Sequence, residues 1–301
     1  MRVAVAASPQ VAIPTIEALL ESSHELVRII SQPDRPAGRG KVLTPTPVSQ
    51  WAMEHEVELV RPASTKEIAE AVAEIDCVLT IGYGVLLPEA ILEIPSRGFL
   101  NLHFSLLPRW RGAAPVQRAI EAGDSLSGVT VFKLDAGMDT GPIYTVHRYA
   151  LDSDITSDEL LVELGEVGVG AVLEALDLVS KGFKPQPQSS EGATRALKLS
   201  RDEALIDWNL DADRVSAKIR AFTSNPGAWT RFRGAVIKVA APHPSDLKLA
   251  PGELLFREKR LFIGTGTTAL EIGVITSAGK AAIPSSSWAN GARLVDGELC
   301  E

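Results

Sequence analysis

Three polar residues alternate with apolar ones near the end of a predicted strand: Asn101, His103 and Ser105. Because the side chains of a strand alternate between its two faces, Asn101 and His103 should lie on one face. A polar face at the carboxyl end of a strand is where α/β sheets place their ligands. There the Asn101 amide could donate to a developing oxyanion, and His103 could carry a proton.

A carboxylate follows in the glycine-rich stretch LDAGMDTGP over residues 134–142, directly after another predicted strand. Loops at two strand ends could bring Asp139 to His103, where it would fix the imidazole and stabilise the protonated ring. However, a lone histidine in a strand is more often structural, and an aspartate between glycines is more often a turn residue. From the pattern alone, the site formed with Asn101 is one hypothesis beside that structural interpretation.

Other kinds of site find little support in the sequence. Its two cysteines form neither a disulfide framework nor a metal cluster, and its five histidines lack the spacing of metal ligands. The stretch AVAASPQ after the first strand contains no glycine, which argues against a dinucleotide-binding site. Neither a P-loop nor a GxSxG motif occurs. We therefore expect no metal and no dinucleotide cofactor.

The pattern of elements predicts an α/β domain followed by a β domain. Strands and helices alternate up to residue 182, which is typical of a mostly parallel sheet. The strands are expected at 2–7, 26–31, 57–60, 77–83, 98–104, 128–134 and 142–150. The helices are expected at 9–23, 48–55, 64–75, 87–95, 114–123 and 157–182. A linker is predicted over 183–204, and short β-like runs over 205–301 indicate a small barrel or sandwich after a helix at 212–223.

Composition is that of an ordinary folded protein. The chain has 301 residues, of which 45% are hydrophobic and 23% charged, and its net charge is −8. These values exclude a disordered chain or a coiled coil, and the apolar runs are too short for a membrane helix. We read no signal peptide at the amino terminus. Together with the low cysteine count, this predicts a cytoplasmic protein.

Asn101, His103 and Asp139 lie within two long motifs: NLHFSLLPRWRGAAPVQRAI, over 101–120, and GVTVFKLDAGMDTGPIY, over 128–144. Both resemble the formyltransferase family that uses 10-formyltetrahydrofolate. Further segments that match this family are 81–92, 198–208, 219–222 and 225–229. The proline-rich basic loop at 32–48 resembles that of family members acting on tRNA, which smaller members acting on nucleotides lack.

The resemblance implies a Rossmann-like catalytic domain over 1–182 and an OB-like, tRNA-binding barrel over 205–301. It implies formyl transfer from N10 of the folate to the methionine α-amino group on initiator tRNA, without a metal. Asn101, His103 and Asp139 match the family's catalytic residues. The folate-binding residues that it implies are Ser105, Leu106, Leu107, Pro108, Tyr83 and Gly84. The tRNA-binding residues that it implies are Arg35, Arg39, Lys41 and Arg220.

In that reaction Asn101 and a protonated His103 would stabilise the oxyanion, while Asp139 would keep His103 charged and relay a proton toward N10. Two other functions remain open: formylation of a sugar-nucleotide or other small amine, and binding of folate or RNA without catalysis. The chain departs from the family at Ala7 and Ser8, after the first strand, and at Phe104. Salt-sensitive tRNA binding would separate a tRNA-dependent enzyme from one acting on a small amine.

Overall fold

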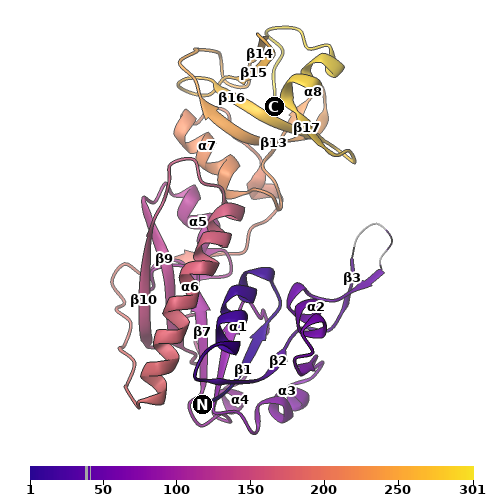
Figure 1. Cartoon of the computed structure of the whole chain (residues 1–301). Coiled ribbons are helices and arrows are strands. Elements are labelled where there is room, and N and C mark those ends of the chain that lie inside the picture. Colours follow the sequence, from indigo (N-terminus) through magenta and orange to yellow (C-terminus); the bar gives the residue numbers. More distant parts are fainter. Residues whose placement is uncertain (38–39, 41) are drawn as a thin grey trace. The chain divides into compact units, whose positions relative to one another are not determined.

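Figure 1 shows the computed structural model, which describes residues 1–37, 40 and 42–301. The chain divides into two compact units. The first contains Met1–Gly112, Leu126–Ala150 and Leu161–Arg195. The second contains Ala113–Ser125, Leu151–Leu160 and Ala196–Glu301. The segment 183–204, expected as a linker, is thus divided between the units, with 183–195 in the first and 196–204 in the second.

A seven-stranded, mostly parallel sheet forms the centre of the first unit, in the order β10-β9-β7-β6-β1-β2-β5. Its parallel strands are β1 (Arg2–Ala7), β2 (Glu25–Ile30), β5 (Leu59–Val60), β6 (Cys77–Ile81) and β7 (Phe99–His103). The antiparallel strands are β9 (Leu126–Lys133) and β10 (Ile143–Ala150). The predicted α/β class is confirmed, and every strand lies within a few residues of its expected range.

Continuous apolar runs build the middle of this sheet. All five residues of β6 are buried, and Phe99 and Leu100 of β7 are almost completely buried. Such runs suit parallel strands, because helices cover both faces. The long helix α6 (Ser157–Ser180) lies close to β7: a Cβ at Gly168 would stand 2.7 Å from Leu102 Cδ2. A glycine at this position therefore allows the helix to approach the strand that carries Asn101 and His103.

The other helices of the first unit are η1 (Gln10–Ala12), α1 (Ile13–Leu20), α2 (Pro47–Glu54), α3 (Thr65–Val72) and α4 (Glu89–Leu92). Two of these helices, α2 and α3, begin at a side-chain cap. Ser64 Oγ accepts a hydrogen bond from Glu67 N at 3.3 Å, and Glu67 Oε2 accepts from Ala63 N at 2.9 Å. This reciprocal capping lies where the helix expected over 64–75 begins.

The proline-rich segment after β2 is more ordered than the loop expected there. β3 (Arg35–Ala37) and β4 (Val42–Thr44) pair antiparallel, and Arg35 lies opposite Thr44. Arg35, Val42 and Leu43 are exposed. Arg39 and Lys41 lie outside the described residues. Among its described residues, the hairpin thus exposes one basic side chain, Arg35, and two apolar side chains, Val42 and Leu43.

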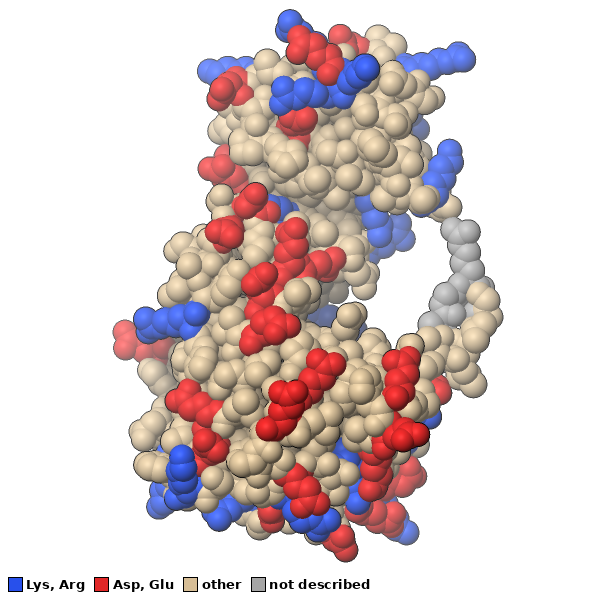
Figure 2. Space-filling model, in the orientation of Figure 1, with Lys and Arg blue, Asp and Glu red and all other residues tan. Residues whose placement is uncertain are grey.

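Acidic residues line the exposed face of α6. Glu163, Glu166, Glu174 and Asp177 are all solvent-exposed. Figure 2 shows Asp and Glu side chains gathered over this helix. Their spacing of three or eight residues keeps them on one side, while Leu164 and Leu176 face the core. This face repels anions such as nucleic-acid phosphates.

The second unit contains a sheet of antiparallel strands, which confirms the β character expected of the C-terminal region. Its order is β12-β13-β16-β15-β14, with β17 beside β16. The strands are β12 (Trp229–Phe232), β13 (Ala235–Pro244), β14 (Leu254–Arg257), β15 (Arg260–Ile263), β16 (Leu270–Ser277) and β17 (Ala282–Pro284). The final residues join both outer strands, since Cys300 forms a bridge with Phe232 and Leu299 with Glu253.

Helices complete the second unit: α5 (Pro115–Glu121), η2 (Asp202–Ala204), α7 (Ala212–Ala221) and α8 (Ser285–Ala292). Lys218 of α7 forms a 2.7 Å ion pair with Glu121 of α5, and Glu121 also pairs with Arg118 at 2.7 Å. These contacts explain why α5, expected within a domain over 1–182, belongs to the second unit. The short strands β8 (Arg111–Gly112) and β11 (Arg195–Ala196) pair with each other.

Candidate active site

Asn101 lies on β7 directly opposite Thr80 of β6. The Thr80 hydroxyl donates to Asn101 Oδ1 at 2.7 Å and also lies 3.0 Å from the Leu100 carbonyl. Thr80 is buried, whereas Asn101 is half-buried. Because Thr80 engages the amide oxygen, the Asn101 nitrogen is the end that can donate to a substrate oxygen. Thr80 was not among the residues expected at the site, because a threonine within an apolar strand such as CVLTI is common.

His103 is held by the backbone of a following loop. Its Nε2 lies 2.9 Å from the Trp110 carbonyl. A carbonyl only accepts, so Nε2 carries the proton and the neutral ring has its lone pair on Nδ1. That Nδ1 lies 3.8 Å from Asp139 Oδ2. The structure thus brings together the two residues that the sequence placed in separate loops.

Burial controls the charge of this imidazole. His103 is only 5% exposed, and the edge of Phe132 lies against it with the ring centroids 6.3 Å apart. Burial lowers the pKa of His103, while the Asp139 charge and the Trp110 carbonyl act in the opposite direction. In the free protein this favours a neutral His103, in contrast to the protonated ring that we expected from the sequence. A neutral ring can accept a proton at Nδ1.

Asp139 approaches His103 through a specific backbone conformation. Its φ angle is +53°, in the left-handed region, which aspartate tolerates better than most residues. Its Oδ2 accepts a hydrogen bond from Gly112 N at 2.7 Å. Within the same loop Asp135 Oδ1 accepts from Gly137 N at 3.0 Å and from Thr140 Oγ1 at 2.8 Å. The loop is therefore ordered by its own side chains and by the segment that follows β7.

The segment 105–108, expected to bind folate, is shaped by internal hydrogen bonds. The Ser105 hydroxyl donates to the Arg109 carbonyl at 2.7 Å. Thr130 Oγ1 donates to the Ser105 carbonyl at 2.7 Å and accepts from Leu107 N at 3.2 Å. Ser105 and Leu107 are buried, whereas Leu106 and Pro108 are half-buried. Any substrate contact in this segment is therefore open to Leu106 and Pro108 more than to the Ser105 hydroxyl.

Tyr83 and Gly84, also expected at the folate site, follow the end of β6. Tyr83 is buried among apolar residues that include Ile91 and Phe99, and burial raises the pKa of its phenol. Its carbonyl accepts a hydrogen bond from Gln32 Nε2 at 2.5 Å. Gly84 is exposed with a φ of +72°. Tyr83 supports the loop from within, and Gly84 lies at its surface.

The residues expected to bind tRNA differ in accessibility. Arg35 is exposed on β3. Arg220, in contrast, is half-buried on α7, and its guanidinium donates to the Ile155 carbonyl at 3.0 Å. Burial lowers the pKa of Arg220. This arginine supports its own unit, and Arg35 is the better-exposed cation.

The cysteines and the possible metal-ligating side chains do not form a second catalytic centre among the described residues. Burial raises the pKa of both thiols, Cys77 and Cys300, to about 12, so neither is an activated nucleophile. Among the described residues, no group of three or more His, Cys, Asp or Glu side chains is arranged to hold a metal ion. Within the same part of the chain, no helix is long and apolar enough to cross a membrane.

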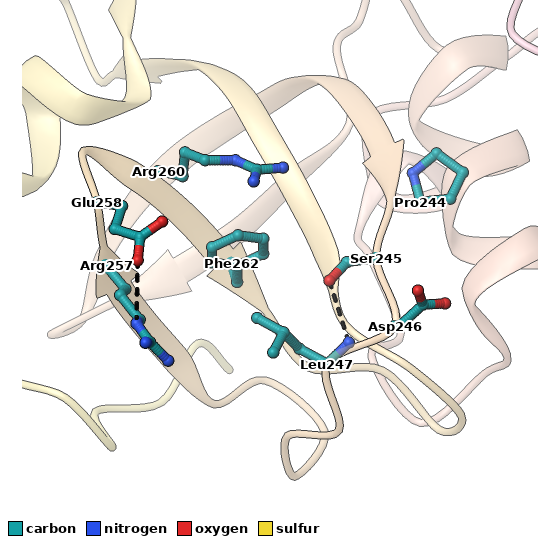
Figure 3. Close-up of a pocket in the computed structure, with 8 residues that line it drawn as sticks. All are labelled: Pro244, Ser245, Asp246, Leu247, Arg257, Glu258, Arg260 and Phe262. Carbon is teal, nitrogen blue, oxygen red and sulfur yellow. Dashed lines mark hydrogen bonds and ion pairs between the residues drawn. The ribbon is translucent and has the colours of Figure 1, made fainter.

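A pocket of the second unit is drawn in Figure 3. Two of its arginines already have acidic neighbours: Arg257 lies 3.6 Å from Glu258, and Arg260 pairs with Glu271. The Arg260 guanidinium also covers the Phe262 ring, 5.1 Å from its centroid. The remaining lining residues are Pro244, Ser245, Asp246 and Leu247. This pocket offers no paired nucleophile and base, unlike the group around His103.

Comparison with known proteins points to the same chemistry. The family model described as formyl transferase matches residues 1–176, and that of the formyl transferase C-terminal domain matches 198–293. A methionyl-tRNA formyltransferase of Salinispora arenicola is 43% identical over 307 residues, covering 99% of both chains. That of Thermobifida fusca is 42% identical over 305 residues, covering 99% of this chain and 98% of the relative.

The fold is also similar to solved structures. HypX from Aquifex aeolicus in complex with tetrahydrofolic acid has a TM-score of 0.68 at 23% identity, covering 96% of this chain and 47% of that one. A methionyl-tRNA formyltransferase from Clostridium thermocellum has a TM-score of 0.58 at 16% identity, covering 82% of this chain and 94% of that one. At these identities the likeness shows the fold alone. The family models and the full-length relatives establish that the chain belongs to the formyl transferase family.

Proposed function

We propose that this chain transfers the formyl group of 10-formyltetrahydrofolate to the α-amino group of methionine on initiator tRNA. The observation that carries the proposal is the arrangement of three side chains at the end of β7. Asn101 Nδ2 can donate, the neutral His103 Nδ1 can accept a proton, and Asp139 Oδ2 lies 3.8 Å from that nitrogen. When an amine attacks a formyl carbon, the reaction requires a donor for the oxyanion and an acceptor for the proton, and these side chains supply both.

The amine must be neutral to attack. An α-amino group has a pKa of about 8, so an appreciable fraction is neutral near pH 7 without help. Its lone pair forms a bond to the formyl carbon, and the electrons of the C=O bond move onto the formyl oxygen. The Asn101 amide nitrogen donates to this oxyanion. Removing a good donor of this kind costs about 3–4 kcal/mol of transition-state stabilisation.

The attacking nitrogen must then lose a proton. His103 accepts it at Nδ1, while the Trp110 carbonyl retains the Nε2 proton at 2.9 Å. The resulting imidazolium is stabilised by the Asp139 carboxylate. Its proton passes to N10 of the folate as the bond between N10 and the formyl carbon breaks. The products are the formylated amine and tetrahydrofolate.

An amine linked to tRNA is favoured over a small amine because the chain is similar to its relatives over its whole length. The relatives named methionyl-tRNA formyltransferase match the chain from end to end, including the second unit. The exposed Arg35 on the β3–β4 hairpin offers a phosphate contact, and we propose the same for Arg39 and Lys41. The acidic face of α6 repels phosphates, so tRNA must approach from another direction. A cytoplasmic location follows from this role.

The test is formyl transfer from 10-formyltetrahydrofolate to charged initiator Met-tRNA, with charged elongator Met-tRNA and a nucleotide-linked amino sugar alongside. We expect rapid formylation of the initiator alone. Transfer only to the amino sugar would establish the small-amine alternative, and folate binding without any transfer would establish a non-enzymatic role.

Variants then test the assigned residues. Asn101→Ala should lower kcat about 10²–10³-fold, and His103→Ala about 10²–10⁴-fold, with tRNA binding retained. His147→Ala is a matched control, because this histidine lies on β10 of the same sheet and pairs with the exposed Glu174 of α6. An His103→Ala variant as active as the His147→Ala control would refute the mechanism.

A further inference from the structure

One glutamine connects the two segments that hold His103 and Asp139. Gln188 lies after α6, where the backbone of Gln186 pairs with Ile143 of β10. Its Oε1 accepts from Arg111 Nε at 3.1 Å and Nη2 at 2.6 Å. Its Nε2 donates to the Asp139 carbonyl at 2.9 Å and to the Gly141 carbonyl at 2.7 Å. Both ends of the carboxamide are thus engaged, each with two contacts.

The segment that contains Arg111 also orients the catalytic groups. Trp110 supplies the carbonyl that fixes His103, and Gly112 supplies the N–H that binds Asp139 Oδ2. Thr194, six residues after Gln188, also supports this segment. Thr194 Oγ1 accepts from Trp110 N at 2.9 Å, and the Thr194 carbonyl accepts from Arg111 N at 2.9 Å. Residues 188 and 194 therefore buttress the loop between β7 and α5.

The hydrogen bonds of Asp135 lie within the Asp139 loop, so they do not connect this loop to residues 110–112. Met138 and Thr140 on either side of Asp139 are exposed, so packing of these neighbours does little to hold the loop. Asp139 itself has a left-handed backbone. The position of its carboxylate relative to His103 depends on how the loop sits against residues 110–112. Gln188 is a direct side-chain bridge between these two segments.

We propose that Gln188 is a positioning residue that sets the distance between Asp139 and His103. It acts through the Asp139 backbone and does not itself contact substrate. The assignment rests on the proposed function, because its catalytic effect is measured in the formyl-transfer reaction. It extends the active site to a segment that the sequence predicted to be a linker.

The chain provides a matched control for the test. Gln186 is exposed, two residues from Gln188, and its pairing with Ile143 uses backbone atoms that an alanine retains. We expect Gln188→Ala to lower kcat about 10–100-fold, as a misplacement of about 1 Å does, while KM for both substrates changes less than about twofold. Gln186→Ala should leave both constants at the wild-type values.

Gln188→Glu separates the two halves of the bridge. Its carboxylate still accepts from Arg111 but cannot donate to the Asp139 and Gly141 carbonyls. We expect kcat to fall at least as far as in Gln188→Ala, although the melting temperature stays closer to that of the wild type. If Gln188→Glu kept wild-type kcat, the donor half of the bridge would have no catalytic role.

A double-mutant cycle distinguishes positioning from a general structural effect. In an Asp139→Asn background the carboxylate is already absent, so Gln188→Ala should lower kcat by less than about threefold more. An effect as large as in the wild type would show that Gln188 does not act through Asp139, and the proposal would be overturned. The same would follow if Gln188→Ala and Gln186→Ala had equal kcat.

A substrate-free measurement keeps the inference separate from the proposed function. Amide hydrogen exchange should be faster over residues 137–141 and 110–112 in Gln188→Ala than in Gln186→Ala. If the wild type failed to formylate Met-tRNA, the function would be wrong while this exchange result still tested the bridge. Unchanged exchange in both segments would refute the bridge itself.

Discussion

Thr80→Val is the substitution that most directly tests how the site is oriented. Valine has nearly the shape of threonine, so it fills the same space in β6 but lacks the hydroxyl that donates to Asn101 Oδ1 at 2.7 Å. The amide oxygen of Asn101 then loses its partner, which costs about 1–3 kcal/mol for a buried polar group. Because valine can pair with neither end of the amide, nothing then fixes which end faces the substrate, and the amide can rotate.

The size of the expected effect follows from that rotation. A rotated Asn101 presents its oxygen to the formyl oxyanion, which removes a donor worth about 3–4 kcal/mol and adds repulsion. Because only part of the population rotates, we expect kcat to fall about 10–100-fold. Thr80→Ser keeps the hydroxyl and should keep kcat within about threefold of the wild type.

Thr145→Val is the matched control for this substitution. Thr145 is a buried threonine of β10, in the same sheet, and its hydroxyl donates to the Ala171 carbonyl at 2.9 Å. The Thr145→Val variant should lose a similar amount of stability, about 1–3 kcal/mol, with little change in kcat. The assay is single-turnover formyl transfer with saturating substrates. The reasoning is refuted if Thr80→Val reacts as fast as Thr145→Val.

Three other predictions follow from burial and packing. Burial lowers the pKa of His103, which acts as a base when neutral. Once kcat/KM is corrected for the neutral fraction of the amine, which itself falls below about pH 8, it should decline with acid only below the usual histidine pKa of 6.5. Asp139→Asn should move that decline to still lower pH, and an opposite movement would contradict the assigned pairing. Arg220→Ala should lower the free energy of unfolding, measured in urea, by about 1–3 kcal/mol, because the Ile155 carbonyl loses its donor. The KM for tRNA should stay within about twofold of the wild type. A large rise in that KM at unchanged stability would instead place Arg220 in direct contact with RNA. Gly168→Ala should lower the free energy of unfolding by about 1–3 kcal/mol in the same urea titration, because the new Cβ would stand 2.7 Å from Leu102 Cδ2. If the variant were as stable as the wild type, α6 would be free to move away from β7.

Asn101 and His103 are examples of features that the local sequence pattern predicts. Alternation along a strand was enough to place both on one face of β7, and the apolar runs were enough to identify the strands of the first unit. The start of α3 was likewise expected at residue 64, where Ser64 and Glu67 cap the helix in the structure. These features depend on residues that are a few positions apart.

The contacts of the site depend on distant residues instead. Thr80 meets Asn101 through the register of two parallel strands, and Gln188 reaches the Asp139 carbonyl from 49 residues further along the chain. Neither partner stands out in the sequence, because a threonine in a strand and a glutamine among prolines are common. The motifs around the proposed catalytic residues therefore indicated the chemistry without the groups that orient them.

The sequence by itself determined the alternation of strands and helices, the shared face of Asn101 and His103, and the family. Only the tertiary structure showed that His103 is buried and which of its ring nitrogens faces Asp139. We expected a protonated ring because Asp139 was the neighbour that the sequence suggested, yet burial lowers its pKa and the Trp110 carbonyl fixes its tautomer. The physical reason is that desolvation depends on everything packed around a group, and that packing exists only once distant segments have come together.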